Sequence, residues 1–411
     1  NPVNGESSHP PRPRDITGDP RAAPTPAPTA LPPKQRASLV KIATDGTLGE
    51  GGPESSIHPF HNTGAGALFY NRLINLTGSF DPIAHLAESW SANSDASEWT
   101  FNLRQGVKFH DGSDFTADDV VYSYAYMLDP DNGSPGVGQF TRFMDENSFT
   151  KIDDFTVKFT PLTPQAEVPL LLHSKEIAVV PDGSTFDSLK AATNGTGPYV
   201  FSDFDHTSQV WVLQKNANYW EPEKPRTDTL EYFGIADETA RVAAISTGAV
   251  DLITATGGAV KVAQLAALDS QPEVNLLKAT SPAISLILYM EIDTPPFDDL
   301  NVRKAMKLVA DREFIADVIL NGLAFPGSDN PIPPFWPVAF RDTATQQDIE
   351  LAKELLAESG YNDDNPLKLQ LYVADIHAGA LEMVQAYQEM AFEAGVEIEL
   401  ITVPKARYWD T

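Results

Sequence analysis

Apolar and polar residues alternate in three short stretches of the early sequence, at 40–44, 99–104 and 155–159. Alternation with a period of two is typical of a strand that buries one face, so each stretch is predicted to be a strand. Thr116 lies three residues before Asp119 and ahead of an apolar run. This pattern resembles a capping box, with Asp in place of the usual Glu or Gln, and predicts the start of a helix. The early region is therefore expected to mix strands with a helix.

The later part of the sequence has a more regular order of elements. Strands are predicted at 230–235, 251–253, 367–373 and 396–400, and helices at 238–246, 302–309, 349–356 and 378–394. A strand, a helix and a second strand in this order form a βαβ unit with parallel strands and a right-handed crossover. Both the middle and the end of the chain are therefore expected to be parallel α/β structure.

The first 37 residues differ in composition from the rest of the 411-residue chain, because they are rich in Pro, Ala, Thr and Arg. Such a segment cannot bury enough apolar area to offset the entropy lost on ordering. Segment 1–37 is therefore predicted to be a flexible Pro/Ala-rich tether, with an ordered surface arm as the alternative. The globular part begins at Ser38, and its length is enough for two or three domains.

The chain is strongly acidic, with 29 Lys and Arg against 57 Asp and Glu and a net charge of −28. This balance argues against nucleic-acid binding and against docking on an anionic membrane through a basic patch. The absence of cysteine excludes disulfides, thiolate metal sites and cysteine nucleophiles. No apolar stretch approaches the ~20 residues that span a bilayer, and no export signal is visible at the start.

Catalytic motifs are mostly missing from the sequence. It has no Walker-type G-x-x-x-x-G-K, no H-E-x-x-H and no G-x-S-x-G. The carboxylate pairs at 118–119, 153–154 and 298–299 are expected to cap helices and form turns, because adjacent acids rarely converge across a cleft. The glycine-rich stretch 195–198 ends in a proline that lacks an N–H donor, and is predicted to be a turn before a strand. These patterns favour binding over catalysis.

The histidines offer two candidate positions. His58 and His61 are three residues apart, but Pro59 lies between them and no further histidine is near in sequence. A plain loop and a metal site both fit this spacing, and the loop is favoured. His377 lies just after a predicted strand, where ligand sites of α/β proteins gather, so a site role and a structural role both stay open.

An ordered set of motifs runs through the sequence, including GVKFHDG at 106–112, NYW at 218–220 and AKELLAESGY at 352–361. The further members are at 86–90, 99–104, 115–123, 195–199, 248–251, 296–299, 302–305 and 310–312. In this order, they resemble the family 5 extracellular solute-binding proteins, whose members bind oligopeptides, dipeptides, nickel complexes, haem or sugars. The resemblance covers about 40–411.

The resemblance implies a periplasmic-binding-protein-like α/β fold, with two α/β lobes joined by a hinge and an inserted mixed α/β domain. Lobe I is expected to be discontinuous, from 38–69 and 182–291. The inserted domain is expected at 70–181 and lobe II at 292–411. Family members normally continue well past the position of Trp409, so lobe II is expected to be incomplete at its C-terminal end.

The resemblance also implies where a ligand binds. In peptide-binding members the loop after the first strand touches the ligand, and a later loop after Asp251 faces the same cleft. His377 resembles a pocket histidine of an oligopeptide binder, and Gly136 stands where such members have a ligand-contacting tyrosine. The implied ligand-binding residues are Phe60, Asn62, Thr63, Gly64, Ala65, Gly136, Thr256, Gly257 and His377.

The expected function is capture of a peptide or similar small solute between two closing lobes, followed by delivery to the permease subunits of an ABC transporter. No enzyme activity, cofactor or metal is expected, and the protein is expected to be a monomer. Its expected location is extracytoplasmic, in the periplasm or on the outer face of the cell membrane. It would meet the membrane only through a lipoprotein-type anchor or the permease. The alternatives are a secreted hydrolase acting on peptides or glycans, and a non-transporting sensor or scaffold.

Overall fold

A computed structural model of the chain describes most of the globular part. The described residues are 38–44, 66–77, 81–132, 134, 137–174, 177–191, 193–205, 207–254, 260–277, 285–327, 329, 345–375, 377–404 and 408. All of them belong to one compact unit, Ser38–Thr411. The predicted tether, 1–37, lies outside the described residues.

The first sheet has five strands in the order β11-β1-β10-β9-β8. Strand β1, the second in this order, pairs in parallel with β10 on one side and with β11 on the other, whereas β9 is antiparallel to both β10 and β8. The elements are β1 (Leu39–Thr44), β8 (Tyr199–Asp205), β9 (Val210–Lys215), β10 (Thr229–Gly234), α7 (Glu238–Ser246), β11 (Leu252–Ile253) and α8 (Val262–Asp269). The parallel β10-α7-β11 unit is confirmed, with β1 inserted between its strands.

A second sheet of four antiparallel strands follows the order β4-β5-β7-β6, and a separate pair joins β2 to β3. The strands are β2 (Ile74–Leu76), β3 (Pro82–Ala84), β4 (Ala87–Ala92), β5 (Trp99–Leu103), β6 (Phe149–Asp153) and β7 (Thr156–Phe159). The helices are α2 (Gly66–Phe69), α3 (Ala117–Leu128), η1 (Pro130–Asn132), α4 (Val137–Phe140), α5 (Val168–Leu171) and α6 (Phe186–Ala191). The early region is thus mixed, as predicted.

The predicted capping box opens α3. The Asp119 carboxylate accepts hydrogen bonds from the Thr116 backbone N–H at 2.7 Å and from the Asp182 N–H at 2.8 Å. Burial raises the pKa of Asp119. One side chain therefore caps the helix and also fixes a distant loop, which the sequence pattern did not indicate.

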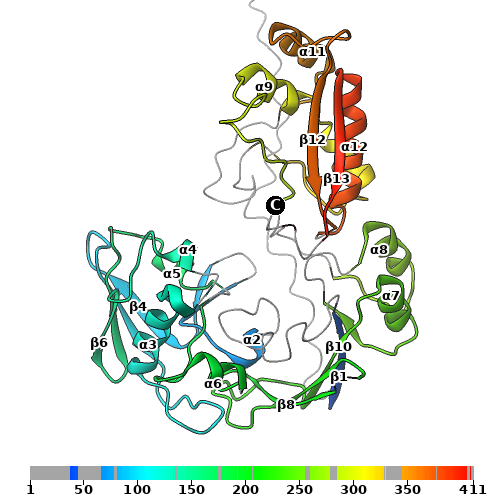
Figure 1. Cartoon of the computed structure of the whole chain (residues 1–411). Helices are drawn as coiled ribbons and strands as arrows, with labels where there is room; N and C mark the ends of the chain where they lie inside the picture. The colour runs from blue at the N-terminus through cyan, green and yellow to red at the C-terminus, as the bar shows by residue number, and fades with distance from the viewer. Residues whose placement is uncertain are drawn as a thin grey trace, which may run out of the picture. The chain divides into compact units, whose positions relative to one another are not determined.

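The C-terminal part packs helices around the parallel pair β12 and β13, and Figure 1 shows the two strands side by side along α12. Its elements are α9 (Leu300–Leu308), α10 (Arg312–Phe314), the π-helix η2 (Ile315–Ile319), α11 (Ile349–Glu358), β12 (Leu367–Val373), α12 (Ala380–Glu393) and β13 (Val396–Thr402). The predicted strands and helices of this part are confirmed. Helix α12 begins two residues later than predicted, because Gly379 before it has a left-handed φ of 83°.

The buried apolar side chains of the described residues form two separate clusters. The first gathers buried residues between Ile42 and Leu230, so the five-stranded sheet and the four-stranded sheet share one core. The second gathers buried residues between Val302 and Ile398. The predicted domain boundaries stay a prediction, although each sheet draws its strands from segments that the sequence assigned together.

A tight backbone crossing joins the first sheet to α2. The Gly197 N–H donates to the Phe69 carbonyl at 2.8 Å, and the His110 N–H donates to the Gly195 carbonyl at 2.9 Å. A Cβ on Gly197 would lie 2.6 Å from the Leu68 carbonyl oxygen and closer still to the Phe69 backbone. The stretch 195–198 is therefore a turn into β8, as predicted, and its glycines allow the crossing.

Candidate functional site

Three parallel strands of the first sheet end at one edge. In the register, Thr44 at the end of β1 lies opposite Gly234 of β10, and Ala43 lies opposite Ile253 of β11. The Thr254 N–H extends this pairing by donating to the Ala43 carbonyl at 3.1 Å. Ligands of open α/β sheets bind beyond the carboxyl ends of such strands. The segments that leave this edge after β1 and β11 are those for which the sequence predicted ligand contacts.

Most predicted ligand-binding residues lie outside the described residues. These are Phe60, Asn62, Thr63, Gly64, Ala65, Gly136, Thr256 and Gly257. The candidate metal pair, His58 and His61, also lies outside them. Their roles in ligand or metal binding stay predictions.

His377 is the predicted site residue that the structure describes. It lies between the end of β12 and the start of α12, is half-buried, and its backbone carbonyl accepts from the Ala380 N–H at 3.1 Å. Its Nδ1 is buried and has no hydrogen-bond partner among the described residues. Because a buried polar atom without a partner is costly, this nitrogen is a candidate for binding a ligand group or water.

An ion pair joins the segment before α8 to the segment that carries His377. Lys261 Nζ lies 3.4 Å from a carboxylate oxygen of Asp375, and the nearby Asp375 carboxylate raises the pKa of Lys261. Lys261 is four residues after Gly257, and Asp375 is two residues before His377. The structure therefore brings the end of one predicted ligand loop to the start of another. Nothing in the sequence of either segment signals a distant partner, so this pair was not predicted.

Close packing surrounds the same contact. A Cβ on Gly379 would lie 3.3 Å from a methyl group of Val262 and would collide with the Leu320 side chain. The start of α8, the residue after η2 and the β12–α12 turn therefore meet in one place. The left-handed Gly379 lets the turn fit there.

The carboxylate pairs have the structural roles that were predicted. Asp299 caps α9 by accepting from the Asn301 N–H at 2.7 Å, and Asp153 accepts from the Phe155 N–H at 2.9 Å in a turn. Within the described ranges, no three His, Cys, Asp or Glu side chains are grouped to hold a metal ion. No helix in the described part of the chain is long and apolar enough to cross a membrane.

A family model described as "Bacterial extracellular solute-binding proteins, family 5 Middle" matches residues 81–411. The chain belongs to this family. The resemblance drawn from the ordered motifs is therefore confirmed. The family consists of solute-binding proteins, and its members are not classed as enzymes.

Curated relatives of the family have different ligands in their names. The chain is 34% identical to "Heme-binding protein A" of Haemophilus influenzae over 316 residues, which are 71% of this chain and 56% of the relative. It is 27% identical to "Glutathione-binding protein GsiB" of Pectobacterium atrosepticum over 372 residues, or 89% of this chain and 70% of that protein. The same protein of Shigella boydii is matched over 63% of its length. The chain thus spans between about half and about two thirds of these relatives.

Solved structures share the fold. The periplasmic binding protein AgaA in complex with agropinic acid, from A. tumefacien R10, has a TM-score of 0.72 at 25% identity. That likeness covers 90% of this chain and 74% of AgaA. DppA from Helicobacter pylori, in complex with the peptide STSA, also has a TM-score of 0.72, at 23% identity and with coverage of 91% and 75%. The predicted periplasmic-binding-protein-like α/β fold is confirmed.

Proposed function

We propose that the chain is the larger part of an extracytoplasmic solute-binding protein that captures a peptide or similar small solute and delivers it to the permease subunits of an ABC transporter. The family match over residues 81–411 carries this proposal. Capture uses no covalent chemistry: the ligand binds one lobe, and closure of the second lobe buries it. The ligand shifts the protein toward the closed form to the extent that it binds that form more tightly.

The arrangement of strand ends supports the proposed location of the ligand. The segments after β1 and β11 leave one edge of the first sheet, and His377 follows β12 of the C-terminal sheet. The Lys261–Asp375 pair brings the approach to α8 close to the His377 segment. The ligand is therefore proposed to lie where these segments meet, with the His377 Nδ1 available to it.

A ligand panel on the full chain tests the proposal. Di-, tri- and oligopeptides, glutathione, haem and a nickel–histidine complex cover the ligand types named for relatives. At least one class is expected to raise the melting temperature, because a ligand that binds only the folded state stabilises it. Native mass spectrometry of freshly purified protein checks for co-purified ligand. No thermal shift and no bound mass would favour a sensor or scaffold.

Turnover distinguishes the proposal from a hydrolase. The captured ligand is expected to be recovered unchanged after prolonged incubation, because the proposed mechanism breaks no bond. Mass spectrometry of the recovered ligand provides the measurement. Reproducible product formation from a peptide or glycan would replace the binding function with a hydrolytic one.

A substitution at His377 tests the location. His377→Ala is expected to weaken binding about tenfold, since a lost buried hydrogen bond costs about 1–2 kcal/mol. Gln370→Ala is the matched control, because Gln370 is exposed on the adjoining strand β12. Equal affinities of the two variants would remove His377 from the ligand site.

A further inference from the structure

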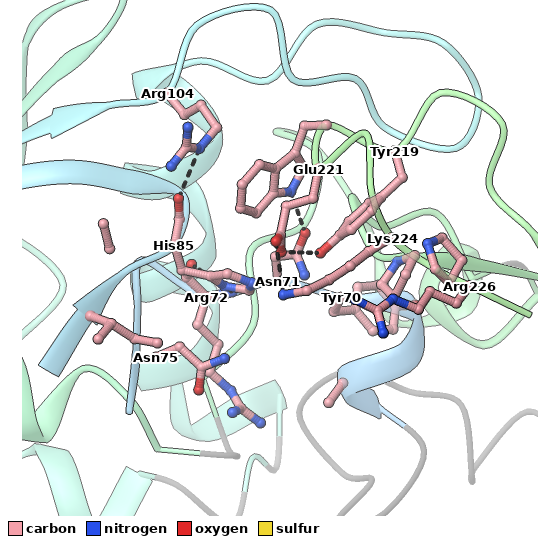
Figure 2. A pocket seen from close by; sticks show the side chains of 16 residues that line it. Tyr70, Asn71, Arg72, Asn75, His85, Arg104, Tyr219, Glu221, Lys224 and Arg226 are labelled. Atoms are coloured by element: carbon pink, nitrogen blue, oxygen red, sulfur yellow. Dashed lines mark hydrogen bonds and ion pairs between the residues drawn. The ribbon is translucent and has the colours of Figure 1, made fainter. Parts of the chain in front are cut away.

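A cavity of about 570 Å³ lies on the part of the chain that contains the first two sheets (Figure 2). Its walls come from residues near β2 and β3, from Arg104 after β5, and from the loop 219–226 between β9 and β10. The volume falls within the ~300–1,000 Å³ typical of small-molecule pockets. None of the lining residues is among the predicted ligand-binding residues.

The cavity is positively charged, although the whole chain has a net charge of −28. Arg72, Arg104, Lys224 and Arg226 line it, and Glu221 is the carboxylate among the described lining residues. Lys224 Nζ lies 2.8 Å from a Glu221 oxygen, so these two charges offset each other. The guanidinium groups of Arg72, Arg104 and Arg226 also line the cavity.

Hydrogen bonds fix the polar wall of the cavity, as the dashed lines in Figure 2 show. The buried Asn71 side chain accepts from Trp220 Nε1 at 2.9 Å and from Thr196 Oγ1 at 3.2 Å. The Tyr219 hydroxyl donates to Glu221 at 3.3 Å. The side chains that surround the positive groups are therefore held in place before any ligand binds, which lowers the entropy cost of binding.

Two of the guanidinium groups are anchored through Nε. Arg104 Nε donates to the His85 carbonyl at 3.1 Å, and its guanidinium lies 4.3 Å from the centre of the Trp220 ring. Arg72 Nε donates to the Ile177 carbonyl at 3.2 Å. Arg104 has one carboxylate neighbour, Glu88 at 3.5 Å, which is about half exposed and therefore contributes little.

Arg226 differs from the other two because it is exposed, and no ion pair to it occurs among the described residues. A planar guanidinium binds carboxylate or phosphate oxygens through two parallel hydrogen bonds. Tyr219, Trp220 and Ile83 also line the cavity and supply apolar surface. The site thus combines anion recognition with space for a carbon skeleton.

Two further residues that line the cavity, His85 and Tyr70, have uncharged side chains. Burial lowers the pKa of His85 to about 4, so its ring is neutral near pH 7 and adds no charge. The Tyr70 hydroxyl is buried without a hydrogen-bond partner among the described residues.

We propose that this cavity is a second binding site, for a small organic anion carrying carboxylate or phosphate groups, with Arg226 and Arg104 as its cationic contacts. The site is independent of the proposed transport ligand, because it uses none of the same residues. Arg226 is the residue that contacts the anion from the open side. Arg104 supplies fixed positive charge from the wall.

Titration of the full chain with citrate tests the proposal, and pyrophosphate at the same ionic strength distinguishes the two anion types. Intrinsic tryptophan fluorescence and calorimetry give the readouts, since Trp220, one of the six tryptophans, lines the cavity. Saturable binding of one probe is expected, and Arg226→Gln is expected to weaken it about tenfold, as for the loss of a charged hydrogen-bond pair.

Arg142→Gln is the matched control, because Arg142 is an exposed arginine that does not line the cavity. It removes the same charge from the molecule, so its affinity is expected to equal that of the unaltered chain. Both variants are first checked for an unchanged melting temperature. Equal weakening in both variants would show a general charge effect and overturn the proposal, as would a linear, non-saturable response to both anions.

Discussion

The two apolar cores of this protein differ in the kinds of side chain that they bury. The first, here called the aromatic core, comprises the buried residues between Ile42 and Leu230, and its largest fully buried side chains include Trp211, Tyr124 and Phe101. The second, here called the aliphatic core, comprises those between Val302 and Ile398, and among the described residues Tyr387 is its one buried aromatic member.

The difference follows from the elements that each core joins. In the aromatic core, rings from antiparallel strands and α3 contact each other directly, as Tyr124 and Phe149 do with centroids 4.1 Å apart. In the aliphatic core, α9 and α11 pack together through small residues such as Ala305 and Ala352, which are fully buried. Rings bury more area per residue, whereas alanines let helices approach closely. We therefore expect the two cores to respond separately to substitution.

The largest effect is expected from removing one large side chain in each core. Phe101 is fully buried and stacks on Trp99 at 6.4 Å, so Phe101→Ala should lower the free energy of unfolding by about 3–5 kcal/mol. Leu356→Ala removes a smaller buried side chain and should cost about 2–5 kcal/mol. Hydrogen exchange measured by mass spectrometry locates each loss.

The regions in which hydrogen exchange rises show whether the two cores lose stability separately. Phe101→Ala is expected to raise exchange in β5 and β7 while α9 and α11 keep their protection, and Leu356→Ala is expected to do the reverse. If either variant loosens both regions equally, the two clusters fold as one cooperative unit and the comparison fails.

The sequence predicts the aliphatic region better than the surroundings of the aromatic core. In the aliphatic region, strand β12 has the predicted bounds, because its alternating pattern is long. The short helices α5 and α6 were not predicted, since four to six residues carry too little periodicity.

The candidate sites were less predictable than the elements. The cavity brings together Asn71, Arg104 and Trp220, which are far apart in sequence and meet only through the shared core. Trp220 packs partly against the aromatic core and also forms the cavity wall. The Lys261–Asp375 pair is a long-range contact of the same kind. For most ligand residues the resemblance was the source of the prediction.

The next largest effect on stability is expected where the turn at 195–198 crosses the backbone of α2. Gly197→Ala places a methyl group against the backbone of Leu68 and Phe69, which cannot rotate away as a side chain can. Overpacking of this kind should lower the free energy of unfolding by about 3 kcal/mol, measured by urea titration.

Gly360→Ala is the control from the aliphatic region. Gly360 has a φ of 89° with open space around its Cβ position, so only backbone strain opposes the methyl group. A cost of about 1 kcal/mol is expected. A cost for Gly197→Ala no greater than this would mean that the α2 backbone moves freely, and that the aromatic region is less rigid than its packing indicates.

Acid is expected to weaken the aromatic region through His85. Burial, the larger cause, lowers the pKa of His85 from 6.5 to about 4, with Arg72 and Lys224 also opposing its protonation. Between these values the unfolded chain binds the proton more readily than the folded protein does. The contribution of the neutral His85 ring to the free energy of unfolding is therefore complete above pH 6.5. It is lost as the pH falls toward 4, which lowers the free energy of unfolding by up to about 3 kcal/mol.

His85→Gln removes this titration and is compared with the unaltered chain by urea unfolding at pH 7.5 and 4.5. The variant is expected to lose less stability across this interval, and the difference should appear as hydrogen exchange in β3 and β4. Identical pH profiles for the two proteins would show that His85 is protonated as easily in the folded state as in the unfolded chain.

The smallest effect is expected at Tyr387, the one buried ring of the aliphatic core in the part of the chain that the structure describes. The Tyr387 hydroxyl donates to the Met306 carbonyl at 2.7 Å, which joins α12 to α9, and burial raises the pKa of this hydroxyl so that it stays a donor. Tyr387→Phe keeps the ring and removes the hydrogen bond, so it should lower the free energy of unfolding by about 1 kcal/mol. Tyr361→Phe is the control, since Tyr361 is only partly buried against the same core. If Tyr387→Phe lowers the free energy of unfolding as much as Leu356→Ala does, the aliphatic core depends on the hydrogen bond between α12 and α9 as much as on its apolar packing. The difference between the two cores would then not lie in their apolar side chains alone.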